Sequence, residues 1–512
     1  MEKGGRRPDQ AGKARAGPSR PASPDTARPA QRAGQPQKTA EIKLQEKLLI
    51  GLVFDFKKLV FNGLVKGFFK KRELNNSTKA IRWPPESLFF VYFFILRGKF
   101  YDKIKSGTTM TYRWTALSIF IWALLSCSTI YAQENTKLSN KKDGGYIFTL
   151  LHDIEATEVQ NQNRTGTCWS FSALSFFESE LLRMKKGKHN LSEMYIARRA
   201  YLDKAVNYVR MHGNFNFGPG GAFHDIPYVI KRYGIVPQEV YQGLEYGMET
   251  HNHSELNNML EAMVKEVIKA PQKKLTPSWK KAINGVLDAY LGEVPEEFEY
   301  QGKTYTPESY AKELGLDMDD YVVITSFTHH PFYESFVLEI PDNWAFGSTY
   351  NVPLDELVEI TDNALEKGFG VAWASDVSEK GFSYRDGLAI VPKDERTIRI
   401  KGRDNRNFSD AGAQKIGSAF DEPVEELAIT QEMRQEAFDN YETTDDHGMH
   451  FTGMVEDQRG TKYYIVKNSW GKTNDCDGYF YASEAFFRYK TTNIMVHKDA
   501  IPKKIKKKLG IK

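Results

Sequence analysis

The chain reads Gln162-Asn163-Arg164-Thr165-Gly166-Thr167-Cys168-Trp169-Ser170-Phe171. An apolar pattern with helical spacing follows Cys168 at once, so we predict that this cysteine begins a helix. The unpaired N–H groups and the dipole at a helix N-terminus favour a thiolate, which is the nucleophilic form of cysteine. The amide of Gln162 can donate to an oxyanion beside the sulfur. Because most lone cysteines are buried and inert, the rest of the chain must support this interpretation.

A histidine and an asparagine that could complete such a site lie near the C-terminal end. His447 begins a predicted strand over 447–457, and the next predicted strand leads into Asn468-Ser469-Trp470-Gly471. Asn468 would accept a ring N–H from His447, and Trp470 would screen that bond from water. Alone, His447 reads as a solvated turn histidine and Asn468 as a turn residue. With Cys168 they predict a Cys–His–Asn site.

These blocks resemble the signature blocks of the papain-like cysteine peptidases. Leu191-Ser192-Glu193 and Gly218-Pro219-Gly220-Gly221 also fit that family. The resemblance implies Cys168 as nucleophile, His447 as general base and then acid, Asn468 as orienter and Gln162 as oxyanion donor. It further implies that Gly220, Gly221 and Trp470 contribute to substrate binding, with peptides as substrates, no metal and no cofactor.

The spacing of these blocks is unusually long. His447 lies 279 residues after Cys168, against roughly 130–150 in short members of the family. The chain therefore resembles the bleomycin hydrolase and aminopeptidase C branch, with a large helical insertion at about 242–345. Gly448 departs from the alanine usual after the histidine. His450 is a rival base, but we prefer His447 because residues three apart on a strand face opposite sides.

The resemblance implies an α+β, papain-like fold with a helical lobe and an antiparallel β lobe over residues 133–500. It implies an aminopeptidase and a homohexamer. A secreted endopeptidase of the same fold, or a non-catalytic binding homologue, is the alternative. In this branch the chain end limits cleavage to substrate N-termini. The basic tail 501–512 could act in this way, although it reads equally as a solvated, frayed end after Pro502.

Periodicity predicts the individual elements. Helices are expected from Cys168 and near 191–211, 222–233, 254–270, 278–290, 306–315 and 353–367. Strands are expected at 321–326, 370–374, 388–392, 447–457, 463–467 and 479–482. The segment His251-Asn252-His253 reads as a surface loop rather than as a metal site.

The charge of the chain is divided unevenly. Residues 1–132 hold 24 Lys and Arg against 9 Asp and Glu, whereas the remainder holds 46 against 57. Because the predicted catalytic part is acidic, we expect no specific nucleic-acid binding.

The N-terminal region has two parts. Residues 1–109 form a basic extension, disordered at least over 1–40, that we expect not to be translated, with the start at Met110. Residues 110–132 have the charged start, apolar core and small-residue end of a signal peptide. They predict an exported, periplasmic or secreted protein, with a lipoprotein anchored through Cys127 as the alternative. Removal of 110–132 leaves only Cys168 and Cys476 and therefore no expected structural disulfide.

Overall fold

The computed structural model describes residues 138–270, 274–401 and 414–512, all within one compact unit. The helices are α4 (Cys168–Arg183), α5 (Glu193–Arg210), α6 (Asp225–Tyr233), α7 (Ser254–Lys269), α8 (Ser278–Leu291), α9 (Pro307–Leu314), α10 (Leu354–Glu366), α11 (Gln431–Asp439), α12 (Glu484–Lys490) and α13 (Lys503–Lys508). The short 3₁₀ turns are η1 (Met318–Asp320), η2 (Glu395–Thr397), η4 (Ser418–Phe420) and η5 (Lys498–Ala500).

One large sheet organises the strands. Its order is β6 (Ser335–Val337), β7 (Ser348–Asn351), β5 (Tyr321–Thr325), β16 (Thr491–His497), β8 (Val371–Ser375), β13 (His447–Asp457), β14 (Lys462–Lys467), β15 (Tyr479–Ser483), β10 (Leu388–Ala389) and β9 (Phe382–Ser383). β2 (Ile147–Asp153) joins β1 (Leu138–Ser139) to β13. Two separate hairpins are β3 (Phe298–Tyr300) with β4 (Lys303–Tyr305), and β11 (Arg399–Lys401) with β12 (Gln414–Ile416).

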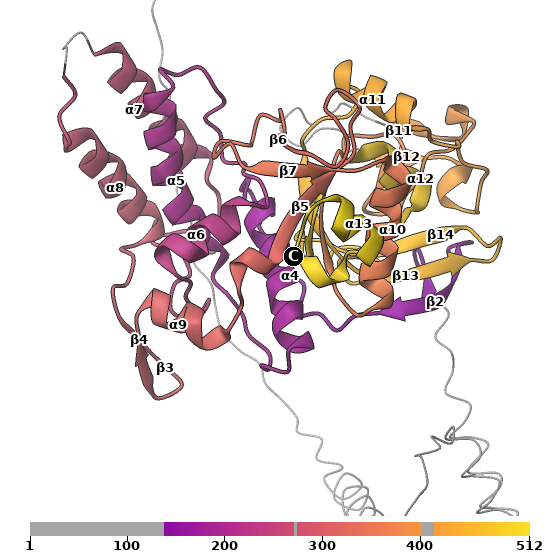
Figure 1. Cartoon of the computed structure of the whole chain (residues 1–512), viewed down its shortest axis with the longest axis horizontal. Coiled ribbons are helices and arrows are strands. Elements are labelled where there is room, and N and C mark those ends of the chain that lie inside the picture. The colour runs from indigo at the N-terminus through magenta and orange to yellow at the C-terminus, as the bar shows by residue number, and fades with distance from the viewer. Residues whose placement is uncertain (1–137, 271–273, 402–413) are drawn as a thin grey trace, which may run out of the picture. The chain divides into compact units, whose positions relative to one another are not determined.

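The two faces of the central sheet pack into different cores. Ala372 and Ala374 of β8 belong to a cluster with α4, α5 and α6, whereas Val371 and Trp373 belong to a second cluster with α10 and α13. Since side chains alternate along a strand, α4 and α10 cover opposite faces. Figure 1 shows α5 to α9 gathered on one side of α4, and the long strands β13 and β14 on the other.

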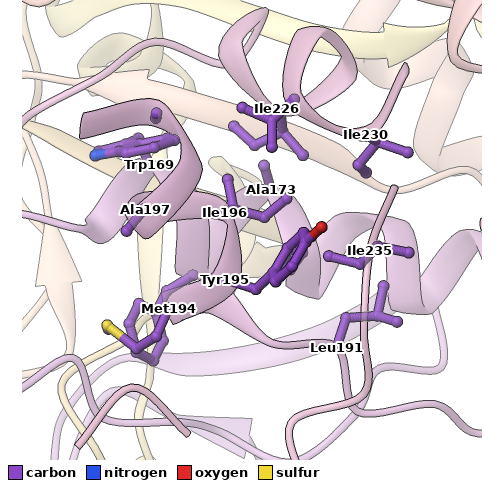
Figure 2. Packing of buried hydrophobic residues seen from close by; sticks show 14 of the residues in the cluster. Trp169, Ala173, Leu191, Met194, Tyr195, Ile196, Ala197, Ile226, Ile230 and Ile235 are labelled. Atoms are coloured by element: carbon purple, nitrogen blue, oxygen red, sulfur yellow. The ribbon is translucent and has the colours of Figure 1, made fainter. Parts of the chain in front are cut away.

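The first core holds the N-terminal turn of α4 in place. Trp169 and Ala173 of this helix pack near Ile196 and Ala197 of α5 and Ile226 of α6, all of them buried (Figure 2). The fold is thus the α+β arrangement that the sequence predicts. The sheet is mixed rather than wholly antiparallel, because β5 pairs with β7 and β10 pairs with β15 in parallel.

Several helices and strands were not predicted from the sequence. β16 lies between β5 and β8 in the sheet, and β2, α11 and α12 were also not predicted. The strand expected at 388–392 is only Leu388–Ala389. The expected helical insertion at 242–345 includes β5, a central strand, so its helical part ends before Tyr321.

Of the two expectations for the C-terminal tail, the frayed end after Pro502 is wrong. Pro502 does not end regular structure: it precedes α13, whose lysine run forms a helix. Proline suits this place because a helix start needs no N–H from it. Ile505 is fully buried and Leu509 is 7% exposed within the second core, so the tail is packed rather than frayed.

The expectations for residues 1–132 lie outside the described residues. Within the part of the chain that the structure describes, no helix combines the length and apolar character needed to span a membrane.

Candidate active site

Cys168 is the first residue of α4, as the sequence predicts. β13 approaches this end of the helix closely because Gly448 has no side chain. A Cβ on Gly448 would lie 2.7 Å from Oγ of Ser172 and 3.3 Å from Cα of Trp169. Cys168, His447 and Gly448 therefore line one pocket.

His447 is held in orientation by its neighbours. Its Nε2 lies 2.7 Å from Oδ1 of Asn468, and Oδ1 also accepts the backbone N–H of Ser469 at 2.8 Å. Because Asn468 presents an acceptor, the ring carries its proton on Nε2 and leaves Nδ1 for proton exchange. The ring of Trp470 lies over the imidazole with centroids 4.7 Å apart. The structure thus brings His447, Asn468 and Trp470 together.

Gln162, in the segment before α4, is held by two hydrogen bonds. Its Nε2 donates to the carbonyl of Thr165 at 2.8 Å, and its Oε1 accepts from Oγ of Ser469 at 2.6 Å. A side-chain amide has two N–H bonds, and Thr165 takes one of them. The other N–H is the one that the predicted oxyanion role would use. The bond to Ser469 ties this donor to the segment that carries Asn468.

Burial acts against the ion pair that the sequence predicts. Burial raises the pKa of the Cys168 thiol to about 12, although backbone N–H groups of Gly448 and Trp169 act in the opposite direction. Burial also lowers the pKa of His447 to about 4, whereas its hydrogen bond to Asn468 acts to raise it. Asp342 and Asp445 raise the thiol pKa further. The backbone N–H groups and Asn468 are therefore the contacts that favour the charged forms of the pair.

His450 lies in the core. Its Nδ1 is 3.0 Å from Oγ of Ser175, seven residues along α4 from Cys168, and its ring meets Phe176 edge-on. Seven helical residues correspond to a rise of about 10 Å. His450 therefore sits too far along α4 to exchange a proton with Cys168.

The glycine loop before α6 forms one wall of the site. Trp169 Nε1 donates to the carbonyl of Pro219 at 3.1 Å, and a Cβ on Gly221 would lie 2.8 Å from the Trp169 ring. The ammonium of Lys204, which is buried, donates to the carbonyls of Gly218 and Gly220. The backbone of this loop is therefore rigidly placed beside Cys168.

Three acidic residues of the pocket were not identified from the sequence. Asp342, Asp445 and Asp446 line it together with Cys168 and His447. Asp445 lies two residues before His447, and this proximity could have indicated a place in the site. From the sequence it was treated as part of a solvated turn. Asp342 follows Ile340-Pro341 in a loop with no motif of its own.

The histidines elsewhere do not indicate a metal centre. In the described ranges, His329, His330 and Glu339 bring three ligand atoms within 4.8 Å of one another. Gln435 Nε2 donates to Nδ1 of His329, so Nε2 of that ring carries the proton and donates to Glu339. This is the geometry of a hydrogen bond rather than of metal ligation.

Two further expectations can be compared with the structure. His253 is fully buried at the start of α7, so the surface-loop interpretation of 251–253 is wrong for this residue. Cys476 is a free thiol that contacts the carbonyl of Asn140 at 2.9 Å. Neither residue lines the pocket around Cys168.

Known proteins share this fold and these segments. The sequence model of the Peptidase C1-like family matches residues 205–392 and 421–511, which include His447 and Asn468. Aminopeptidase G of Lactobacillus delbrueckii subsp. lactis is 26% identical over 396 residues, covering 69% of this chain and 83% of the relative. Aminopeptidase C of Listeria innocua is 24% identical over 400 residues, covering 69% and 83%.

A solved structure supports the fold. The crystal structure of PepW from Lactobacillus rhamnosis HN001 matches with a TM-score of 0.53 at 20% identity, covering 71% of this chain and 84% of that chain. The predicted resemblance to papain-like cysteine peptidases is confirmed by these matches. The chain belongs to the Peptidase C1-like family and is a cysteine peptidase.

Proposed function

We propose that this protein is an aminopeptidase that hydrolyses peptide bonds through Cys168, His447 and Asn468. The observation that carries the proposal is the hydrogen bond between Nε2 of His447 and Oδ1 of Asn468, beside a pocket that also contains Cys168. This arrangement supports the roles of Cys168 as nucleophile, His447 as base and Asn468 as orienter of the base.

The reaction begins with attack by Cys168. As Sγ of Cys168 attacks the peptide carbonyl carbon, its proton passes to His447, and the carbonyl oxygen becomes an oxyanion. The free N–H of Gln162 and the backbone N–H of Cys168 donate to that oxyanion. His447 then gives its proton to the leaving amine as the C–N bond breaks. Water, deprotonated by His447, finally releases the acyl group from the sulfur.

Aminopeptidase specificity is supported by the names of the relatives, which are Aminopeptidase G, C, W and E. Endopeptidase activity is the second candidate, because the papain-like fold is compatible with either. A non-catalytic homologue is disfavoured by the ordered contacts of His447 and Gln162, which such a protein would not need.

Two experiments test the proposal. A peptidyl epoxide should label wild-type protein at Cys168 with one equivalent and should leave Cys168→Ser unlabelled, with Cys476→Ser as the matched control that labels normally. A wild type that does not label would favour the non-catalytic reading. Leucyl peptides with free and N-acetylated amines then separate the two activities, because an aminopeptidase cleaves only the free form.

Export and assembly are further proposals. The signal-like segment 110–132 supports an exported enzyme, with lipid attachment at Cys127 as the alternative. Mass analysis of the N-terminal peptide of the native protein distinguishes cleavage after Ala132 from processing at Cys127. A homohexamer rests on the branch resemblance, and light scattering tests it.

A further inference from the structure

The loop between β6 and β7, residues 338–347, enters the pocket of Cys168 (Figure 1 labels both strands). Ile340 and Asp342 of this loop line the pocket directly. Asp342 Oδ2 is so near the glycine wall that a Cβ on Gly220 would lie 1.7 Å from it. The loop therefore covers the backbone edge that the family resemblance assigns to the substrate peptide.

The loop is held firmly in this position. Asn343 bridges it internally, with its Nδ2 3.0 Å from the carbonyls of both Leu338 and Gly347. Trp344, 1% exposed, anchors it against Tyr228 of α6. Asn216 Nδ2 donates to Oδ1 of Asp342 at 3.2 Å. The position of the carboxylate is thus set by the fold and not by a flexible end.

The pocket carries an excess of acidic groups. Asp342, Asp445 and Asp446 line it, and Asp225 lies behind Gly221, where a Cβ would be 2.8 Å from its Oδ2. Asp446 accepts from the backbone N–H of Val377 and from Oγ of Ser378. Lys204 interacts with Asp225, Asp342 and Asp445, and its ammonium is already bound to two loop carbonyls. Burial raises the pKa of these three carboxyl groups although the charge of Lys204 acts in the opposite direction, so their negative charge is costly without a further cation.

A second observation points to a missing cationic partner. Oδ2 of Asp445 is shielded from solvent and has no hydrogen-bond partner among the described residues. A buried carboxylate oxygen without a donor costs free energy unless a ligand satisfies it. The free volume of the pocket is about 20 Å³, enough for one water-sized group such as an ammonium.

We propose that Asp342, supported by Asp445, binds the α-ammonium group of the substrate and blocks the cleft beyond it. This inference rests on the proposed aminopeptidase function and names the residue that makes the enzyme an exopeptidase. A substrate with one residue before the scissile bond places its ammonium against Asp342. A longer substrate must pass between Gly220 and Asp342, where there is no room. The packed tail 501–512 contributes no residue to this pocket.

The test compares three leucine-type substrates in wild type and Asp342→Asn. These are leucyl-aminomethylcoumarin, its N-acetyl form, and the 4-methylpentanoyl form that lacks the amine. Wild type should prefer the free amine over the amine-free form. In Asp342→Asn this preference in kcat/KM should fall at least about tenfold, the factor that about 1.4 kcal/mol represents. Asp319→Asn, an exposed partner of Lys231, is the matched control and should keep the preference.

The outcomes are distinguishable. Wild type that cleaves no free-amine substrate, although Cys168 labels, would overturn the proposed function itself. An aminopeptidase whose Asp342→Asn variant keeps its full preference would overturn only the role of Asp342. Asp342→Ser gives a second measurement if the amide variant does not fold. Loss of folding in both variants, seen as a lost melting transition, would make Asp342 structural and would also overturn the inference.

Discussion

Oδ1 of Asn468 lies 2.7 Å from Nε2 of His447 and accepts, in addition, the N–H of Ser469. The second contact prevents the amide from turning, so the histidine always meets an acceptor and keeps one tautomer. The oxygen of Ser469 in turn binds Gln162. Asn468 and Ser469, adjacent in the chain, therefore hold both His447 and Gln162 in place.

Asn468→Ala should lower kcat while leaving KM nearly unchanged, because it removes orientation and no substrate contact. The loss should be smaller than that of His447→Ala, which removes general acid–base catalysis worth about 10²–10⁴-fold. Steady-state kinetics measure both variants. Asn258→Ala on the exposed side of α7 is the control. An Asn468→Ala enzyme as inactive as His447→Ala would show that the amide does more than orient.

Gln162→Ala should lower kcat by about 10²–10³, corresponding to about 2.7–4 kcal/mol, as expected for loss of one oxyanion donor. Its bonds to Thr165 and Ser469 mean that the change also removes structural contacts. Ser469→Ala is therefore the matched variant, since it removes the bond that holds Gln162 and leaves the donor. Melting temperatures separate the two effects. Unchanged turnover in a folded Gln162→Ala enzyme contradicts the donor role.

Cys168, His447 and Asn468 could be predicted from the sequence because each lies in a short segment whose structure depends on neighbouring residues. The helix start at Cys168 and the strand start at His447 follow from apolar periodicity within a few residues. Asp342 could not be found in this way. Its place depends on the loop 338–347 crossing to Gly220, over a hundred residues earlier in the chain, and on Trp344 as an anchor.

The same reasoning explains the missed elements. β16 is buried on both faces, so Thr491–His497 lacks the polar alternation that marks an exposed strand. The helix α13 was missed because Ile505 is its one buried residue, and Leu509 follows directly after its end, so a segment rich in exposed lysines carries little apolar periodicity. The thiolate expectation considered only the helix terminus, whereas burial and the neighbouring Asp342 and Asp445 raise the pKa of Cys168.

Asp342→Asn should lower the pKa of Cys168, since the Asp342 charge raises it in the resting enzyme. The rate of iodoacetamide alkylation at Cys168 is measured against pH by peptide mass spectrometry. In wild type the midpoint of this pH profile should lie above the ordinary thiol pKa, and in the variant it should lie at lower pH. Asp319→Asn supplies the control for removal of a remote charge. A midpoint that does not move would show that Asp342 is neutral in the resting enzyme.

The buried histidines should make the protein unstable in acid. Burial lowers the pKa of His253 to about 3 and that of His447 to about 4. The unfolded chain, with ordinary histidine pKa values, binds more protons to these two residues in that range, so their contribution to stability is complete above about pH 6.5 and falls as the pH drops towards 4. His253→Leu should reduce this fall in urea denaturation, because neither ring nitrogen has a hydrogen-bond partner among the described residues. The exposed His212→Asn should leave the fall unchanged. An equally steep fall in His253→Leu would mean that His253 is not neutral in the folded protein.

Ile505→Ala should destabilise the protein without changing its substrate preference. Ile505 of α13 is fully buried in the core that includes α10. Truncation of such a side chain to alanine costs about 2–5 kcal/mol of folding stability. The active pocket lies against α4 on the other face of the sheet, so the ratio of free-amine to N-acetyl cleavage should stay at the wild-type value. Lys504→Ala, on the exposed side of the same helix, should change neither quantity. Urea midpoints and kcat/KM ratios measure the two effects.

A chain ending at Ala500 should behave as Ile505→Ala does. If the truncated protein stays folded and begins to cleave N-acetylated peptides, the tail and not Asp342 limits the enzyme to substrate N-termini.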